Sequence, residues 1–285
     1  MKQHTNTDPV FSFEFFPPKN AEGAARLRKA RARLAALKPE YFSVTFGAGG
    51  STRDRTLETV LEIQREGDID AAPHISCISS SRSELRDLLQ LYRDHGLRRL
   101  VALRGDLPSG TGGGLGEFRF AVELVRFIRE EFGDHFRIEV AAYPEVHPQA
   151  RNAEKDLKHF CEKAAAGADS AITQYFYNPD AYAFFLERVS AKGVDIPIIP
   201  GIMPITNYTQ LARFSDACGA EIPRFIRKRL EAYGDDTASI RAFGTEVVTR
   251  LCQRLLDEGA PGLHFYSMNQ AAASEAIWKN LKQGT

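Results

Sequence analysis

The 285-residue sequence contains few cysteines and no long hydrophobic run. Cys77, Cys161, Cys218 and Cys252 are scattered without CxxC spacing, so neither a zinc site nor a disulfide framework is predicted, and a reducing compartment is favoured. No apolar run approaches the roughly 18 residues that a membrane span requires. The N-terminal MKQHTNTDPV lacks a basic-then-apolar signal. We therefore expect a soluble, cytoplasmic protein.

An excess of charge of either sign is also absent. The 37 lysines and arginines balance the 37 aspartates and glutamates, so no strong net field attracts nucleic acid or an anionic membrane. The basic stretch RLRKARARL, residues 26–34, would spread over a broad helical face, and no aromatic residue interleaves to stack on bases. We expect a small neutral or anionic substrate, with no nucleic-acid or membrane partner.

The glycine-rich stretch LRGDLPSGTGGGLGE, residues 103–117, lacks the common phosphate-binding signatures. Its glycines do not fall at G-x-G-x-x-G offsets, and no Gly-Lys-Ser/Thr follows. We interpret it as a loop after the fourth strand, with Arg104 and Asp106 fixed where the strand ends. The alternative is that these two residues form a local ion pair that caps the strand.

Short runs rich in Val, Ile, Phe and Tyr alternate with longer charged stretches of helical period, which is typical of α/β structure with parallel strands. The predicted strands are 11–16, 41–47, 71–78, 99–106, 137–144, 170–177, 196–202 and 262–268. The predicted helices are 20–37, 52–66, 81–95, 118–132, 150–166, 179–191, 207–218 and 270–282, with an extra helical segment over 221–258. Eight strands, each followed by a helix, indicate a (β/α)8 TIM barrel, and we expect residues 1–285 to form a single catalytic domain.

Side-chain alternation within the strands supports the barrel, because interior and helix-covered positions must alternate there. In the first strand Phe11, Phe13 and Phe15 share one face, and Ser12 and Glu14 share the other. Polar residues recur on the corresponding face of later strands: Ser43, Thr45, His74, Ser76, Arg104, Asp106, Glu139, Tyr143, Gln174, His264 and Tyr266. We interpret this set as the wall of a site at the C-terminal mouth of the barrel. The alternative for any one member is a hydrogen-bonded core residue.

One carboxylate, Glu14, lies among four phenylalanines in FSFEFFPP, residues 11–18. A lone ionised carboxylate in a buried strand costs several kcal/mol unless it is paired or takes up a proton. Its placement therefore suggests a function.

The stretch AAYPEVHP, residues 141–148, ends a strand with Tyr143, Glu145 and His147 held between two prolines that stiffen the turn. Two potential metal ligands without a third at a credible spacing are a weak signal, so we expect no metal site.

The stretch DLKHFCEKAAAGAD, residues 156–169, places Asp156, His159 and Lys163 at i, i+3 and i+7, on one side of a helix. These three side chains are candidates for one wall of the site. An ordinary solvated helix face is the alternative.

Taken together, the motifs resemble a known family. The resemblance to methylenetetrahydrofolate reductase of the bacterial type spans about residues 10–280, and it is carried in order by FSFEFFPP, SVTFGAGGS, APHISCI, VALRGDLP, AAYPEVHP, AITQYFY, IIPGIMP and LHFYSMN. It implies a flavoprotein barrel in which NADH or NADPH reduces FAD. A hydride then passes to 5,10-methylenetetrahydrofolate, giving 5-methyltetrahydrofolate for methionine synthesis. It also implies that the regulatory domain of longer eukaryotic relatives is absent, and we expect a homo-oligomer.

The resemblance implies roles for individual residues. Glu14 would be the general acid that protonates the 10-nitrogen and opens the folate ring to an iminium, since a poorly solvated carboxyl retains its proton more readily. Asp106 would lie beside the flavin, disfavour the anionic reduced flavin and stabilise the cationic iminium. Gln174 would bind the pterin and the nicotinamide, and Phe214 would stack on whichever ligand is present. The residues implied to line FAD are Thr45, His74, Arg104, Gly105, Asp106, Ala121, Tyr143, His147, Asp156 and Lys163.

Some positions depart from the family pattern. His159 and Glu162 stand where relatives often have asparagine and arginine, and a glutamate near a pyrophosphate would repel it. Phe120 replaces a tyrosine and lacks its hydroxyl. Gln270 stands where an arginine is common, so the folate glutamate tail would have to be held in another way. Phe120 and His159 stay among the predicted FAD residues, and Gln270 among the predicted substrate residues.

Two other functions remain open from the sequence. One is a different FAD-dependent barrel oxidoreductase acting on an amine or imine, similar to proline dehydrogenase. Such an enzyme would need arginines near the last helix to hold a carboxylate, and Gln270 and the residues after it offer none. The other is a flavin- or pterin-binding protein without turnover, which the presence of Glu14 and Asp106 disfavours.

Overall fold

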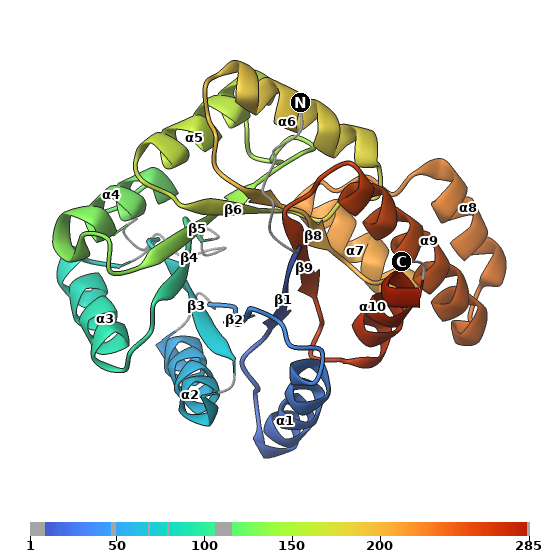
Figure 1. Ribbon diagram of the computed structural model, residues 1–285, viewed down its shortest axis with the longest axis horizontal. Coiled ribbons are helices and arrows are strands. Elements are labelled where there is room, and N and C mark those ends of the chain that lie inside the picture. Colours follow the sequence, from blue (N-terminus) through green and yellow to red (C-terminus); the bar gives the residue numbers. More distant parts are fainter. Residues whose placement is uncertain (1–8, 47–49, 68, 79, 106–115, 284–285) are drawn as a thin grey trace.

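The structure is a computed structural model that describes residues 9–46, 50–67, 69–78, 80–105 and 116–283. Parallel strands form an inner ring and the helices surround it (Figure 1). The strands are β1 (Val10–Phe15), β2 (Tyr41–Val44), β3 (Asp70–Ser76), β4 (Arg99–Leu103), β5 (Arg137–Ala142), β6 (Ser170–Thr173), β7 (Ile198–Ile199), β8 (Gly201–Ile202) and β9 (Gly262–Tyr266). The helices are α1 (Ala21–Ala35), α2 (Gly50–Glu66), α3 (Arg82–Asp94), α4 (Ala121–Phe132), α5 (Ala153–Ala165), α6 (Pro179–Ala191), α7 (Tyr208–Cys218), α8 (Arg224–Tyr233), α9 (Thr237–Asp257) and α10 (Ala272–Gln283).

The strand order in the described residues is β7-β6-β5-β4-β3-β2-β1-β9-β8. Only Pro200 separates β7 from β8, and proline interrupts a strand because it has no N–H to donate to the ladder. The two short strands are therefore halves of the strand predicted over 196–202, and the order returns to its starting point. The predicted (β/α)8 barrel is confirmed.

Helix ends follow local sequence signals. Asn20, Asn152 and Asn207 cap α1, α5 and α7 by accepting a hydrogen bond from a backbone N–H of the first turn. The segment predicted as helical over 221–258 forms two helices, because the backbone at Gly234 turns to φ 53° and ψ −118° between α8 and α9.

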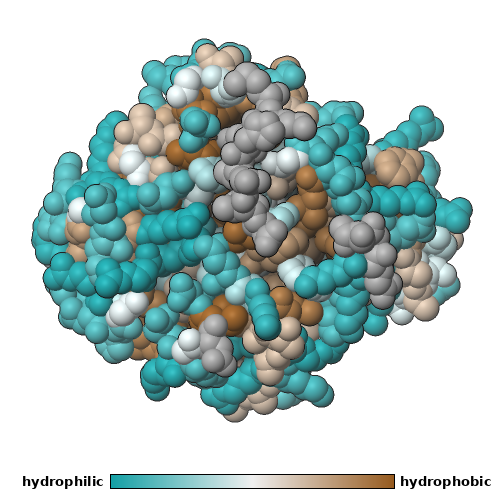
Figure 2. Space-filling model, viewed as in Figure 1, coloured by the Kyte–Doolittle hydropathy of each residue, from teal (hydrophilic) through white to brown (hydrophobic). Residues whose placement is uncertain are grey.

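The side-chain alternation predicted for the first strand is confirmed. Phe13 and Phe15 are fully buried in the hydrophobic core, and the Phe13 ring stacks on Phe265 of β9 at a centroid distance of 5.4 Å. The face of the molecule in Figure 2 is largely hydrophilic, with hydrophobic residues showing toward its middle. Over the described part of the chain, no helix is long and apolar enough to cross a bilayer.

Some of the polar interior residues form a buried network instead of a site wall. The Glu139 carboxylate, fully buried, accepts hydrogen bonds from Arg99 Nη1 at 2.8 Å, from the Tyr41 hydroxyl at 2.6 Å and from Ser170 Oγ at 3.3 Å. For Glu139 the interpretation as site wall is wrong, and the alternative of a hydrogen-bonded core residue holds. The reason is depth: Glu139 is the third residue of β5, far from its carboxyl end.

Candidate active site

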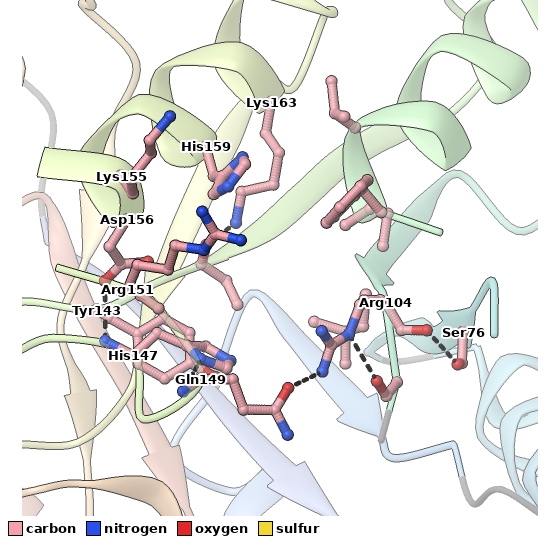
Figure 3. A pocket seen from close by; sticks show the side chains of 18 of the residues that line it. Ser76, Arg104, Tyr143, His147, Gln149, Arg151, Lys155, Asp156, His159 and Lys163 are labelled. Atoms are coloured by element: carbon pink, nitrogen blue, oxygen red, sulfur yellow. Dashed lines mark hydrogen bonds between the residues drawn. The ribbon is translucent and has the colours of Figure 1, made fainter. Parts of the chain in front are cut away.

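A cavity of about 700 Å³ lies where β4 and β5 end and α4 and α5 begin (Figure 3). It is lined by Phe46, Ser76, Ala102, Leu103, Arg104, Gly105, Phe120, Ala121, Val122, Ala141, Tyr143, His147, Gln149, Ala150, Arg151, Lys155, Asp156, His159 and Lys163. The carboxyl ends of parallel barrel strands meet at one mouth, which is where TIM-barrel enzymes place their active sites. A cavity of this size accommodates a ligand of cofactor dimensions.

The cavity wall is rich in cations. Arg104, Arg151, Lys155 and Lys163 line it, and Asp156 is the only carboxylate among the described lining residues. Burial lowers the pKa of Lys163 to about 8, although the nearby Asp156 carboxylate opposes this shift. This charge distribution favours an anionic ligand.

The loop after β5 is fixed by hydrogen bonds that reach α5 and β4. The Asp156 carboxylate accepts from the His147 backbone N–H at 2.9 Å, and the His147 ring packs edge-on against Tyr143 at 4.5 Å. Arg104 Nη2 donates to Gln149 Oε1 at 2.5 Å across the cavity (Figure 3). These contacts hold Tyr143 and His147 in the wall.

Gly105 cannot be replaced without strain. Its φ is +86°, and a Cβ at this position would lie 1.9 Å from Ser76 Oγ. The Ser76 hydroxyl in turn donates to the Arg104 carbonyl at 2.8 Å. Glycine at residue 105 therefore allows a left-handed backbone packed closely against Ser76 at the end of β4.

The rim between α4 and α5 is aromatic. Phe120 is 47% exposed, and its ring stacks on His159 at 5.6 Å. The Glu162 carboxylate is 3.2 Å from His159 Nδ1 and 3.7 Å from Lys158 Nζ, and it does not line the cavity. Its negative charge is thus paired with neighbours on its own helix. Asp156, His159 and Lys163, predicted to share one side of this helix, all line the cavity.

The Glu14 carboxyl group, 11% exposed, lies inside the barrel near its mouth. Its Oε2 is 3.3 Å from His74 Nε2 and 3.6 Å from His264 Nε2. Burial lowers the pKa of His74, and the Glu14 charge counteracts that effect. Alternation along β1 turns Phe13 and Phe15 to the opposite face, as predicted, so the polar neighbours of Glu14 are His74 and His264.

Nine of the residues predicted to contact the cofactor line the cavity: Arg104, Gly105, Phe120, Ala121, Tyr143, His147, Asp156, His159 and Lys163. Thr45 and His74 do not line it. Asp106 falls outside the described residues.

The predicted substrate residues are dispersed around the mouth. Gln174, which follows β6, lines a small second cavity that shares Tyr143 with the first. Phe214 on α7 is 37% exposed, and Gln270 is exposed ahead of α10. The structure does not bring these three side chains to the main cavity wall.

Sequence reasoning missed several lining residues, among them Phe46, Gln149, Arg151 and Lys155. Arg151 and Lys155 flank the start of α5, and a count of cations at helix starts beside strand ends would have found them. Gln149 carries no such signal. Among the described residues, no group of three or more His, Cys, Asp or Glu side chains could hold a metal ion.

Fold and cavity together define a TIM-barrel protein with a cation-rich cavity at the carboxyl ends of its strands. The family model described as methylenetetrahydrofolate reductase matches residues 1–282. This chain therefore belongs to the methylenetetrahydrofolate reductase family of oxidoreductases.

Individual relatives agree with this assignment. The 5,10-methylenetetrahydrofolate reductase of Salmonella typhimurium is 40% identical over 270 residues, covering 95% of this chain and 90% of the relative. The Escherichia coli protein of the same description is 39% identical with the same coverage. A protein from rice, Oryza sativa, described as a probable methylenetetrahydrofolate reductase (NADH), is 37% identical, and the match covers 48% of its length. Membership of this family overrides the proline dehydrogenase-like alternative.

A solved structure has a similar fold. It is an uncharacterized protein from Clostridium thermocellum that binds two copies of 5-methyl-5,6,7,8-tetrahydrofolic acid, and it superposes with a TM-score of 0.71 over 98% of this chain and 96% of its own. At 18% identity this likeness shows the shared barrel fold alone.

Proposed function

We propose that this chain reduces 5,10-methylenetetrahydrofolate to 5-methyltetrahydrofolate with electrons from NADH or NADPH, using FAD bound at the barrel mouth, in the cytoplasm. The observation that carries the cofactor assignment is the cationic cavity after β4 and β5. Family membership supports the substrate and the reaction.

The residues of the cavity fit FAD in charge and shape. Arg104, Arg151, Lys155 and Lys163 would hold the pyrophosphate, and the tight turn at Gly105 lets the backbone approach the cofactor closely. Exposed aromatic surface at Phe120, with the Tyr143 ring, suits contact with planar rings. When bound, FAD would accept electrons from the nicotinamide and pass them to the folate.

The chain itself would supply the proton. A carboxyl at Glu14, enclosed within the barrel but 11% exposed, can meet a substrate that enters the mouth. Glu14 would donate its proton to the 10-nitrogen of the folate, which opens the ring to the iminium that is then reduced. The carboxylate left behind would face His74 and His264.

The other predicted roles remain part of this proposal. Gln174 would bind the pterin and the nicotinamide in turn, Phe214 would stack on either ligand, and Gln270 would lie near the glutamate tail. Asp106 would tune the flavin. The two substrates would use one site alternately, which gives ping-pong kinetics.

The visible spectrum of the purified protein tests this function. We expect a flavin spectrum that anaerobic NADH or NADPH bleaches and that added 5,10-methylenetetrahydrofolate restores. Menadione, a non-specific oxidant, serves as the control that the reduced cofactor is competent. Recovery of colour with menadione but not with methylenetetrahydrofolate would contradict the proposal, and failure of both nucleotides to bleach the protein would favour binding without turnover.

A further inference from the structure

One oxygen of Glu14 lies between two imidazoles that come from different strands. Oε2 is 3.3 Å from Nε2 of His74 on β3 and 3.6 Å from Nε2 of His264 on β9. These distances are those of close polar contacts between a carboxyl oxygen and two ring nitrogens, slightly longer than ordinary hydrogen bonds. His74 Nε2 is buried and makes no hydrogen bond to any residue that the structure describes.

The His264 ring is held from its other side. Its Nδ1 is 2.7 Å from Ser12 Oγ. Both residues are buried: the exposed fraction is 0% for His264 and 1% for Ser12. Pairing of β1 with β9 sets this contact, because Ser12 lies opposite His264 in the parallel register. The pairing of β1 with β9 therefore orients the His264 ring.

Two tyrosines and a serine also lie close to His264, and His74 interacts with it electrostatically. The Tyr41 ring stacks on it at 6.0 Å, the Tyr266 ring meets it edge-on at 5.5 Å, and Ser43 Oγ is 3.5 Å from Nε2. Burial raises the pKa of both tyrosines well above the ordinary value, so they stay neutral.

The chemistry of these contacts selects one tautomer of a neutral His264. Once Glu14 has given up its proton, its carboxylate only accepts hydrogen bonds, so a favourable contact with it requires the His264 proton on Nε2. Nδ1 is then the acceptor, and the Ser12 hydroxyl can donate to it. The hydrogen bond from Ser12 thus orients the His264 ring so that its Nε2–H points at the carboxyl oxygen of Glu14. Hydrogen bonds to one ring nitrogen commonly set the tautomer and orientation of catalytic histidines in this way.

From this geometry we infer that His264, oriented by Ser12, is a positioning residue of the folate half-reaction, holding Glu14 Oε2 through Nε2–H so that the other carboxyl oxygen faces the substrate. The inference rests on the proposed role of Glu14 as the proton donor. The proton passes from Glu14 to the 10-nitrogen of the folate, and the negative charge that remains on Glu14 is stabilised by the N–H of His264, which keeps its own proton. The nicotinamide half-reaction involves no such charge and is independent of His264.

Two substitutions separate positioning through Nε2 from simple packing. A glutamine amide reaches the location of Nε2, whereas an asparagine amide reaches that of Nδ1. In stopped-flow measurements on the flavin-loaded enzyme, we expect His264→Asn to be reoxidised by methylenetetrahydrofolate about tenfold or more slowly than His264→Gln. Reduction by NADH should proceed at similar rates in both variants.

A matched serine pair tests the orienting contact. Ser170 is buried in the same interior but donates to Glu139, so Ser170→Ala is the control for Ser12→Ala. We expect folate-dependent reoxidation to slow several-fold more in Ser12→Ala than in Ser170→Ala. Equal rates for the two alanine variants, or an asparagine variant at least as fast as the glutamine variant, would overturn the inference.

The histidine tautomer gives a readout on the unaltered enzyme. In ¹⁵N NMR of the flavin-loaded protein, assigned by loss of one histidine signal in His264→Gln, we expect Nδ1 of His264 to be the unprotonated nitrogen. A proton on Nδ1 with Nε2 unprotonated would overturn the inference even if every variant failed to fold. Failure of the unaltered enzyme to be reoxidised by methylenetetrahydrofolate is a different result, which would refute the proposed function itself.

Discussion

At the scale of single residues, Lys163 combines a cost in stability with a proposed role in binding the cofactor. Burial lowers its pKa to about 8, from an ordinary value of 10.5. Between these values the unfolded chain binds the proton and the folded chain does not, so the stability of the ligand-free protein rises with pH across that window. At pH 7 the charged, partly buried Lys163 therefore destabilises the fold, and in the proposed function it would supply a cation for the pyrophosphate.

Replacing Lys163 with methionine should separate these two effects. We expect Lys163→Met to increase the free energy of unfolding of the flavin-stripped protein at pH 7 by about 1–3 kcal/mol, because a similar volume is filled without a buried charge. The same variant should lose FAD more readily on dilution, since one cation of the wall is gone. Urea unfolding and flavin fluorescence measure the two quantities.

Lys163→Arg is the control, because it keeps the charge. We expect it to bind FAD more tightly than Lys163→Met does, without the gain in stability. A methionine variant that retains FAD as well as the unaltered protein would contradict the placement of the pyrophosphate at Lys163.

At the scale of elements, the backbone that leaves β4 lines the cavity at Gly105. Gly105 there has φ +86° and no room for a Cβ, whereas Gly96, which follows α3, has φ +77° and open space around it. The two glycines share a backbone conformation and differ in their surroundings. They therefore separate the cost of a left-handed backbone from the cost of a steric overlap.

We expect Gly105→Ala to destabilise the protein by about 2–4 kcal/mol and Gly96→Ala by about 1 kcal/mol, because both strain the backbone and only the first also overlaps Ser76. Thermal unfolding at equal flavin occupancy measures the difference. In a Gly105→Ala, Ser76→Ala double variant, part of the loss at Gly105 should be recovered. Equal destabilisation by the two single glycine variants would show that the contact with Ser76 yields at little cost.

The elements themselves were largely predictable, because the signals that form them are local. An asparagine predicts the start of a helix, and the alternation of Phe13 with Glu14 predicts a strand. Each signal extends over only a few residues. Strand ends were predicted too long: the strand expected over 170–177 ends at Thr173. The hydrophobic residues Tyr175 to Tyr177 continue its sequence pattern, but they pack after the strand and do not pair within it.

The site was predictable only in part, because its contacts depend on the register of distant strands. The cavity residues of α5 follow from helical spacing within one element. Proximity of Ser12 and His264, which are 252 residues apart, follows from the pairing of β1 with β9 and has no local signal. For the same reason, the sequence could not show that Glu14 faces two histidines.

At the scale of the whole molecule, one buried carboxylate joins four strands across the barrel interior. Glu139 on β5 accepts hydrogen bonds from Tyr41 on β2, Arg99 on β4 and Ser170 on β6. Arg99 also contacts Glu40 and lies over the Tyr41 ring at 4.2 Å. Burial, reinforced by the Glu139 charge, raises the pKa of Tyr41, so its hydroxyl remains a donor.

Removal of this one charge should weaken the whole barrel. We expect Glu139→Gln to lower the free energy of unfolding by about 3 kcal/mol, because a buried Arg99 loses the more deeply buried of its two carboxylate partners. The surface pair of Arg82 and Glu130, at 3.4 Å, is the control, and Glu130→Gln should cost less than about 1 kcal/mol. Urea denaturation compares them. A similar loss for both variants would mean that the interior network contributes no more than a surface ion pair.

The central claim, that one carboxyl group serves the folate half-reaction alone, is tested most directly by anaerobic stopped-flow measurement of both half-reactions in Glu14→Gln. Glutamine keeps the size of the side chain but has no acidic proton to give. We predict that NADH still reduces the flavin at close to the normal rate, and that reoxidation by 5,10-methylenetetrahydrofolate slows by about 100-fold or more. Equal slowing of the two half-reactions would contradict the account, because Glu14 would then support the structure of the site and not donate the proton.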